Sequence, residues 1–213
     1  MLAGRLRGRI FFAADDDRLC REVQVFRRRM FVDELGWDLT VHDGREHDEF
    51  DRNDAILFAL QRHDAVVGCF RALRCDRPYL SREVFPGLAS DVSYPSTSDC
   101  WEISRLAVSD RSAGAPLYAA MLDFGWKRRA RALVALVDLS HERMLRAMQI
   151  HTRRYGAPAV VGINRSGRQI DAVAGEIPLD EQSPVLHRAV SQILAHMEIS
   201  DETLVLGPDR VSA

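Results

Sequence analysis

The chain has 213 residues, of which 46% are hydrophobic and 28% charged, and its formal net charge is −2 at pH 7. This length suits a single domain spanning residues 1–213, with enough apolar residues for a sizeable core. The small negative charge excludes a general attraction to nucleic acid, and no apolar run approaches the ~20 residues of a membrane span. Four cysteines without a CxxC pair favour a reduced, cytoplasmic protein.

The first half of the chain predicts a helix followed by a hairpin. Three aspartates at 15–17 are N-cap candidates, and apolar residues from Leu19 to Met30 keep helical spacing behind them. The predicted elements are a short strand at Arg9–Ala13, a helix from about Arg18 to Leu35, an acidic loop from Asp38 to Asp54, a hairpin of strands Ala55–Arg62 and Ala65–Arg74 turning at His63 and Asp64, and a helical turn within Pro78–Leu88.

The second half alternates strands and helices. The predicted elements are a strand at Asp99–Val108, a helix from about Ala115 to Ala130, a buried strand at Leu133–Leu139, a helix capped by Ser140, a strand pair at Ala159–Asn164 and Gln169–Gly175, a helix after Pro184 and a terminal strand at Thr203–Leu206. This order indicates an α/β fold, with one sheet covered by helices on both faces.

The strand Asp99–Val108 carries two charges, Glu102 and Arg105, inside an apolar run. Each would cost several kcal/mol, roughly, if it were buried without a partner. Side chains an odd number of residues apart point to opposite faces of a regular strand, so the two charges serve different surfaces unless a bulge turns one of them. A catalytic cleft and a buried ion pair that braces the sheet both remain open at this point.

Two further features bear on a functional site. Arg71 is a third charge on an otherwise apolar strand face, and the acidic run around Phe50 is expected to be a solvated but anchored loop. His42 and His47 flank this run, but without cysteine partners or an HExxH frame no metal site is expected.

Four blocks of residues, in order and with matching internal spacing, resemble the acyl-homoserine-lactone synthases, the family of quorum-sensing autoinducer synthases. The blocks are Arg27, Phe31 and Trp37; then Glu46, Asp48, Phe50 and Asp51; then Gly68 to Arg71; then Trp101 to Arg105. The resemblance extends from about residue 20 to 150 and is loose beyond Gly156. It implies catalytic roles for Glu102, Arg105 and Arg71, and binding of S-adenosylmethionine by Arg27, Phe31, Trp37, Asp48 and Asp51.

The same resemblance implies the reaction. The family joins an acyl group, usually carried by acyl carrier protein, to S-adenosylmethionine and releases an N-acyl-homoserine lactone, with no further cofactor. Its fold is similar to the GNAT acyltransferases, in which two splayed parallel strands admit the pantetheine arm. Glu102 is the expected base for the amine, while acidic side chains suit the cationic groups of S-adenosylmethionine and an arginine suits its carboxylate.

Several features stay open between functional and structural readings. Residues Arg111 to Ala115 resemble a GNAT phosphate loop imperfectly, and a plain helix start is equally compatible. Apolar helical residues could line an acyl tunnel or simply belong to the core; these are Met121, Leu136, Met144, Leu145 and Met148. A group of basic residues could dock an acidic carrier or merely complement helix dipoles; these are Lys127, Arg128, Arg129, Arg131, Arg146, Arg153 and Arg154.

Two alternative functions follow from the same residues. A GNAT-type N-acyltransferase would use acyl-CoA and a different amine, and it would leave S-adenosylmethionine intact. A nucleic-acid-binding regulator is suggested by the arginines at 27–29 and the basic cluster from Lys127 to Arg131. The net acidic charge, the lack of a helix-turn-helix pattern and the charges expected inside apolar strands argue against it.

Overall fold

The computed structural model describes residues 5–204, which divide into two compact units. Unit 1 contains residues 5–72, Arg105–Met121 and 191–204, and unit 2 contains Leu73–Ser104 and Leu122–Val190. Four elements run from one unit into the other: strands β5 (Ala65–Arg74) and β6 (Cys100–Val108), and helices α3 (Gly114–Lys127) and α5 (Pro184–Leu194). The single-domain expectation stays a prediction.

Unit 1 is built on strands in the order β11, β1, β4, β5. β1 (Leu6–Phe12) pairs parallel with β11 (Glu198–Asp201) and antiparallel with β4 (Ile56–Arg62), which forms the predicted hairpin with β5. The turn residues His63 and Asp64 have φ of 50° and 65°, as a tight hairpin turn with two left-handed residues requires. The hairpin prediction is therefore confirmed.

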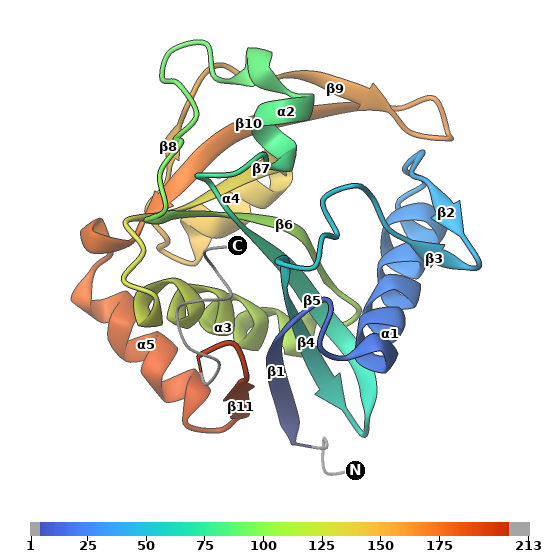
Figure 1. Ribbon diagram of the computed structural model, residues 1–213. Helices are drawn as coiled ribbons and strands as arrows, with labels where there is room; N and C mark the ends of the chain where they lie inside the picture. The colour runs from blue at the N-terminus through green and yellow to red at the C-terminus, as the bar shows by residue number, and fades with distance from the viewer. Residues whose placement is uncertain (1–4, 205–213) are drawn as a thin grey trace. The chain divides into compact units, whose positions relative to one another are not determined.

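The helix of unit 1 begins where the sequence predicts and changes form near its end. Asp16 caps α1 (Asp17–Arg27), accepting a hydrogen bond of 2.9 Å from the backbone N–H of Leu19. The chain continues as a π-helix, η1 (Arg28–Glu34), a form often found at functional sites. α1 packs against β4 and against a small hairpin of β2 (Val41–His42) and β3 (Arg45–Glu46), which lies beside it in Figure 1. This hairpin was not predicted from the sequence.

Unit 2 is built on strands in the order β6, β7, β10, β8, with β9 also pairing with β10. The new strands are β7 (Ala132–Asp138), β8 (Arg153–Arg154), β9 (Ala159–Ile163) and β10 (Gln169–Pro178), and the new helical segments are α2 (Leu80–Val84), η2 (Pro86–Leu88), α4 (Leu139–Ala147) and η4 (Leu179–Glu181). α4 packs on β7 and β10 (Figure 1). The strand β8 was not predicted, because a strand of two residues has no hydrophobic periodicity.

The parallel strands β6 and β7 pair over only a short stretch. Their register ends at Glu102 and Val134, whereas β7 stays paired with β10 as far as Asp138. The two strands therefore separate beyond Glu102, which agrees with the expected pair of splayed parallel strands.

Two predicted boundaries are wrong. α4 is capped by Asp138, not Ser140, because the Asp138 carboxylate accepts hydrogen bonds from the backbone N–H groups of Ser140 and His141. The terminal strand lies at Glu198–Asp201, while Thr203 and Leu204 form a turn. The last two residues of the predicted strand, 205 and 206, lie outside the described residues.

Replacing Asp138 with alanine is expected to lower the free energy of unfolding by about 1 kcal/mol, because α4 loses its cap. Burial opposes ionisation of Asp138, but the hydrogen bonds from Ser140 and His141 outweigh it and hold its pKa below the usual range. Urea unfolding of Asp138→Ala and Ser140→Ala checks this assignment. An equal loss from Ser140→Ala would contradict it.

Candidate active site

Six charged side chains of unit 1 lie together. They come from the end of α1, from β3 and the loop after it, from β5 and from β6, and they are Arg27, Glu46, Asp48, Asp51, Arg71 and Arg105. Up to about sixty residues separate the partners along the chain, so the fold and not local sequence brings them into contact.

Arg27 is held by two carboxylates. Its Nε donates to Glu46 Oε2 at 2.5 Å, while Nη1 and Nη2 donate to the two oxygens of Asp51 at 2.7 and 2.8 Å. The paired contact with Asp51 is the bidentate geometry that a planar guanidinium favours. All three donor nitrogens of Arg27 therefore point at carboxylates.

The other two arginines complete a closed ring of alternating charge. Arg71 pairs with Asp48 and also reaches Asp51 Oδ1 at 3.0 Å. Arg105 donates from Nε to Glu46 Oε1 at 3.0 Å and from Nη2 to Asp48 Oδ2 at 2.8 Å. Each carboxylate thus bridges two arginines, and three positive and three negative charges balance. We call these six residues the charge ring.

The charge ring is buried except on one side. Arg27 and Arg71 are fully buried and Glu46 and Asp51 nearly so, whereas the side chains of Arg105 and Asp48 are 10% and 14% exposed. The expectation of a solvated acidic loop is therefore wrong for these carboxylates. The sequence showed their charges but not the buried arginines that draw them inward.

The arginines keep the ring carboxylates ionised. Burial alone would raise the pKa of Asp51, but Arg27 and Arg71 outweigh it and hold that pKa well below its usual range. Burial acts in the same direction on Asp48, and Arg71 and Arg105 again lower its pKa overall. Both carboxylates are therefore charged at neutral pH.

Acidification is expected to destabilise the protein through these two groups. A carboxyl group whose pKa is lower in the folded state contributes stability above its unfolded pKa of about 4, and that contribution is lost as the pH falls through the folded pKa. Urea unfolding measured from neutral pH down to about pH 3 checks this. The fall should be shallower in Asp51→Asn, and an unfolding free energy that rises on acidification would contradict the assignment.

Phe31 and Trp37 form a stacked pair in the same unit. Their ring centroids lie 5.1 Å apart with an angle of 17° between the planes. Phe31 sits in the π-helix and is buried, while Trp37 follows Gly36 and is partly exposed. The backbone N–H of Trp37 donates to the backbone carbonyl of Phe31 at 2.9 Å, and Gly36 supplies the left-handed φ of 69° that this turn needs.

Glu102 lies in unit 2 and is completely buried. Its carboxylate accepts hydrogen bonds from the backbone N–H groups of Leu80 at 3.1 Å and Ser81 at 2.7 Å, and from the Ser81 hydroxyl. These N–H groups open α2, so Glu102 holds the start of that short helix. Ser81 is a partner that the sequence analysis did not identify.

The partners of Glu102 and Arg105 bear on the two readings of their strand. Glu102 is held by Leu80 and Ser81, whereas Arg105 pairs with Glu46 and Asp48. Arg105 has φ of 53°, so β6 is irregular at the position where a bulge was considered.

The segment from Arg111 to Ala115 begins a helix. Asp110 caps the turn η3 (Arg111–Ala113) and accepts from the backbone N–H of Ala113 at 3.1 Å and from the Ser112 hydroxyl. Arg62 Nη1 donates to the same carboxylate at 3.0 Å. These are the contacts of an ordinary N-cap, which favours the plain helix start.

Glu46 was among the residues that carry the family resemblance, but no role was predicted for it. In the structure it bridges Arg27 and Arg105.

Within residues 5–204, no group of three or more histidine, cysteine, aspartate or glutamate side chains could hold a metal ion. No helix in that range is long and apolar enough to cross a membrane.

The chain is similar to known proteins in both sequence and structure. The autoinducer synthase family model matches residues 13–186. An acyl-homoserine-lactone synthase of Aeromonas hydrophila is 31% identical over 186 residues, which cover 81% of this chain and 85% of that protein. Both matches span residues of both units.

Solved structures agree with these matches. TofI, in a ternary complex with an inhibitor and MTA, is 33% identical, has a TM-score of 0.73 and aligns over 87% of this chain and 96% of its own. BjaI, a CoA-dependent acyl-homoserine lactone synthase solved with SAM and isopentyl-CoA, shows the same fold with a TM-score of 0.76 at 24% identity, over 92% of this chain and 93% of its own. The expected GNAT-like α/β fold is confirmed, and the chain belongs to the autoinducer synthase family, the acyl-homoserine-lactone synthases.

Proposed function

We propose that this enzyme makes an N-acyl-L-homoserine lactone from S-adenosylmethionine and an acyl thioester, releasing methylthioadenosine. The charge ring carries the proposal, because it is neutral overall yet presents one carboxylate and one guanidinium, Asp48 and Arg105, on its less buried side. A zwitterionic amino acid group needs that pair of partners. TofI was solved with MTA, the expected product of this reaction.

The partly exposed and the buried residues of the charge ring have different proposed roles. We assign Asp48 to the cationic ammonium or sulfonium of S-adenosylmethionine and Arg105 to its carboxylate. Arg27 and Asp51, sequence candidates for direct binding, are buried against each other and act as positioning residues. Arg71, a candidate catalytic residue, takes the same role through Asp48 and Asp51.

The stacked aromatic pair suits the adenosyl group. Trp37 is partly exposed and its ring is fixed by stacking on the buried Phe31, so it offers a rigid apolar face. Stacking with an adenine ring requires such a face and loses little conformational entropy. We assign Phe31 and Trp37 to this subsite.

Acyl transfer needs a base and a place for the thioester. Glu102 is the proposed base for the amine, directly or through a water molecule, and three hydrogen bonds fix its carboxylate. It is also the last β6 residue that pairs with β7, so it stands where the strands part. Backbone N–H groups there would stabilise the tetrahedral oxyanion. Lactonisation then needs mainly positioning of the carboxylate against its own γ-carbon.

Acyl carrier protein is the proposed donor, in the cytoplasm. The exposed Arg129 and Arg146 of unit 2 suit an acidic carrier. Coenzyme A thioesters are the alternative, because BjaI shares the fold and is CoA-dependent. Kinetics with matched carrier and coenzyme A thioesters separates the two donors.

Reversing the charge of Arg129 and Arg146 is expected to raise the KM for an acidic carrier several-fold and to flatten its dependence on salt. These exposed residues of unit 2 suit the test better than Arg128, whose guanidinium lies 3.9 Å from the Phe124 ring centroid and contributes to packing. The KM for S-adenosylmethionine serves as the control and should not change. A carrier KM that is unaffected at low and high salt would rule out docking at these residues.

Mass spectrometry of lipophilic products from cells that express the chain tests the proposed function. Lactones with an N-acyl chain are expected only in expressing cells. A GNAT-type transferase acting on another amine would give acylated amines and leave S-adenosylmethionine intact. That product pattern would replace the proposal.

A further inference from the structure

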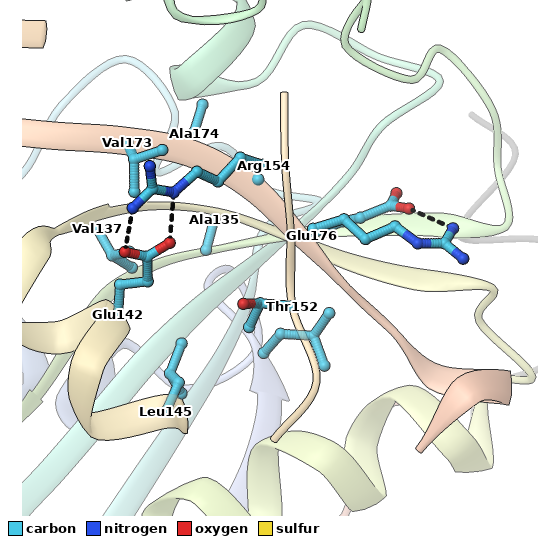
Figure 2. A pocket seen from close by; sticks show the side chains of 12 residues that line it. Ala135, Val137, Glu142, Leu145, Thr152, Arg154, Val173, Ala174 and Glu176 are labelled. Atoms are coloured by element: carbon cyan, nitrogen blue, oxygen red, sulfur yellow. Dashed lines mark hydrogen bonds and ion pairs between the residues drawn. The ribbon is translucent and has the colours of Figure 1, made fainter. Parts of the chain in front are cut away.

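The paired arginines of this protein are held in different ways. In unit 2, Arg154 donates to both oxygens of Glu142 across the pocket between α4 and the β7–β10 pair, which Leu145 of the acyl-tunnel candidates also lines (Figure 2). The Arg154 side chain is 44% exposed, so it can leave this pair for solvent. Arg105 of the charge ring is nearly buried, and its position therefore depends on the backbone that carries it.

Arg105 has an uncommon backbone conformation. Its φ of 53° lies in the left-handed region, where the Cβ of any residue other than glycine crowds the backbone. Such a conformation persists only where the surrounding structure fixes it. From this conformation Arg105 reaches Glu46 through Nε at 3.0 Å and Asp48 through Nη2 at 2.8 Å. The place of the guanidinium therefore depends on the groups that hold this part of β6.

The side chain of Cys69 contacts the β6 backbone from the neighbouring strand β5. Its thiol donates to the backbone carbonyl of Arg105 at 3.4 Å, and the backbone N–H of Ala107 donates to the same sulfur. Cys69 is completely buried, and this burial raises the pKa of its thiol to about 12, so the thiol keeps its proton and remains a donor. One side chain thus satisfies two backbone groups that flank Leu106.

Cys69 lies on the face of β5 that serves the charge ring. Cys69 and Arg71 are two residues apart on this strand, so their side chains point to the same side. β5 also lies close against β6 here, since a Cβ on Gly68 would lie 3.4 Å from the carbonyl oxygen of Ala107. The thiol is therefore placed to support the ring from the β6 backbone.

We propose that Cys69 is a positioning residue that keeps Arg105 directed into the charge ring. The inference rests on the proposed function, in which Arg105 binds the carboxylate of S-adenosylmethionine, and adds the residue that fixes Arg105 there. Without a donor at residue 69, the Arg105 carbonyl loses this partner inside the protein. Arg105 then relaxes toward an ordinary strand conformation, which withdraws its guanidinium from Glu46 and Asp48.

Binding of S-adenosylmethionine to the purified full chain, measured by calorimetry, is the first test. Cys69→Ala removes the donor and should weaken binding by about two- to tenfold, the net contribution of one hydrogen bond. Cys69→Ser keeps a donor on the same side chain, an O–H in place of the S–H, and should bind nearly as the wild type does. The control is Cys20→Ala, which replaces a partly exposed cysteine of α1 and should leave binding unchanged.

The Arg105 Nε–H gives a second readout that needs no substrate. Because this group donates to Glu46 in a nearly buried site, it should exchange slowly with solvent and give its own NMR signal, identified by its absence in Arg105→Lys. Exchange should be faster in Cys69→Ala and stay slow in Cys69→Ser. Cys69→Val keeps the site filled but has no donor, so it decides the question if Cys69→Ala does not fold.

An Arg105 Nε–H that exchanges as slowly in a folded variant without the donor as in the wild type would overturn the proposal. Equal losses of affinity in Cys69→Ala and Cys69→Ser would also overturn it, because both would then reflect packing alone. If the wild type did not bind S-adenosylmethionine at all, the proposed function would be wrong, while the exchange measurement would still decide whether Cys69 positions Arg105.

Discussion

Replacing Arg27 with methionine is expected to lower the free energy of unfolding by about 3–5 kcal/mol and to abolish lactone synthesis. Arg27 is fully buried and neutralises both Glu46 and Asp51. Without Arg27, the Glu46 and Asp51 carboxylates each lose a partner in a site from which water is excluded. Asp51 then no longer holds the Arg71 guanidinium in place. Urea unfolding and a lactone assay on the same samples measure both effects.

The matched control is Arg18→Met on the same helix. Arg18 is highly exposed and pairs only across one helical turn with Glu22, so its replacement should change stability by less than about 1 kcal/mol and leave synthesis intact. If Arg27→Met were as stable as Arg18→Met, the charge ring would not stabilise the fold.

Glu102→Gln is expected to reduce kcat by about 10²- to 10⁴-fold while the protein stays folded. Glutamine keeps an oxygen that can accept from the start of α2, but it cannot take a proton from the amine. The assay follows methylthioadenosine release by purified enzyme, and circular dichroism reports the fold.

Ser81→Ala separates catalysis from support of α2. It removes the hydroxyl contact to Glu102 but keeps the carboxylate and the backbone N–H bonds. A base at Glu102 predicts a much larger kcat loss in Glu102→Gln than in Ser81→Ala. Equal losses in the two variants would make Glu102 a structural clamp.

Elements were predicted correctly where the hydrophobic periodicity and the turn residues indicate the same boundaries. The hairpin around His63 and Asp64 is one case, because left-handed turn residues separate two apolar runs. The N-cap of α4 was predicted wrongly from the same kind of signal. Asp138 and Ser140 are both good capping residues two positions apart, and only the fold shows which carboxylate or hydroxyl meets the free N–H groups.

Five of the six charge-ring residues were candidates from the sequence, but their arrangement was not predicted. Arg71 and Arg105 stood out because a charge in an apolar strand needs a partner, yet periodicity does not say which one. Asp48 and Asp51 lie in an acidic run that is usually solvated, and only the buried arginines of distant strands turn them inward. Glu46 could have been found by asking which carboxylates balance the charges of Arg27, Arg71 and Arg105.

The most direct test of the account follows both products of one reaction. Purified protein is given S-adenosylmethionine labelled in the four carbons of its 3-amino-3-carboxypropyl group, together with an acyl donor, and labelled lactone and methylthioadenosine are quantified together. Equal amounts of the two products are predicted, with all label in the homoserine lactone ring. Acylated product that keeps its sulfonium, or label that stays in S-adenosylmethionine while the donor is consumed, would contradict the account.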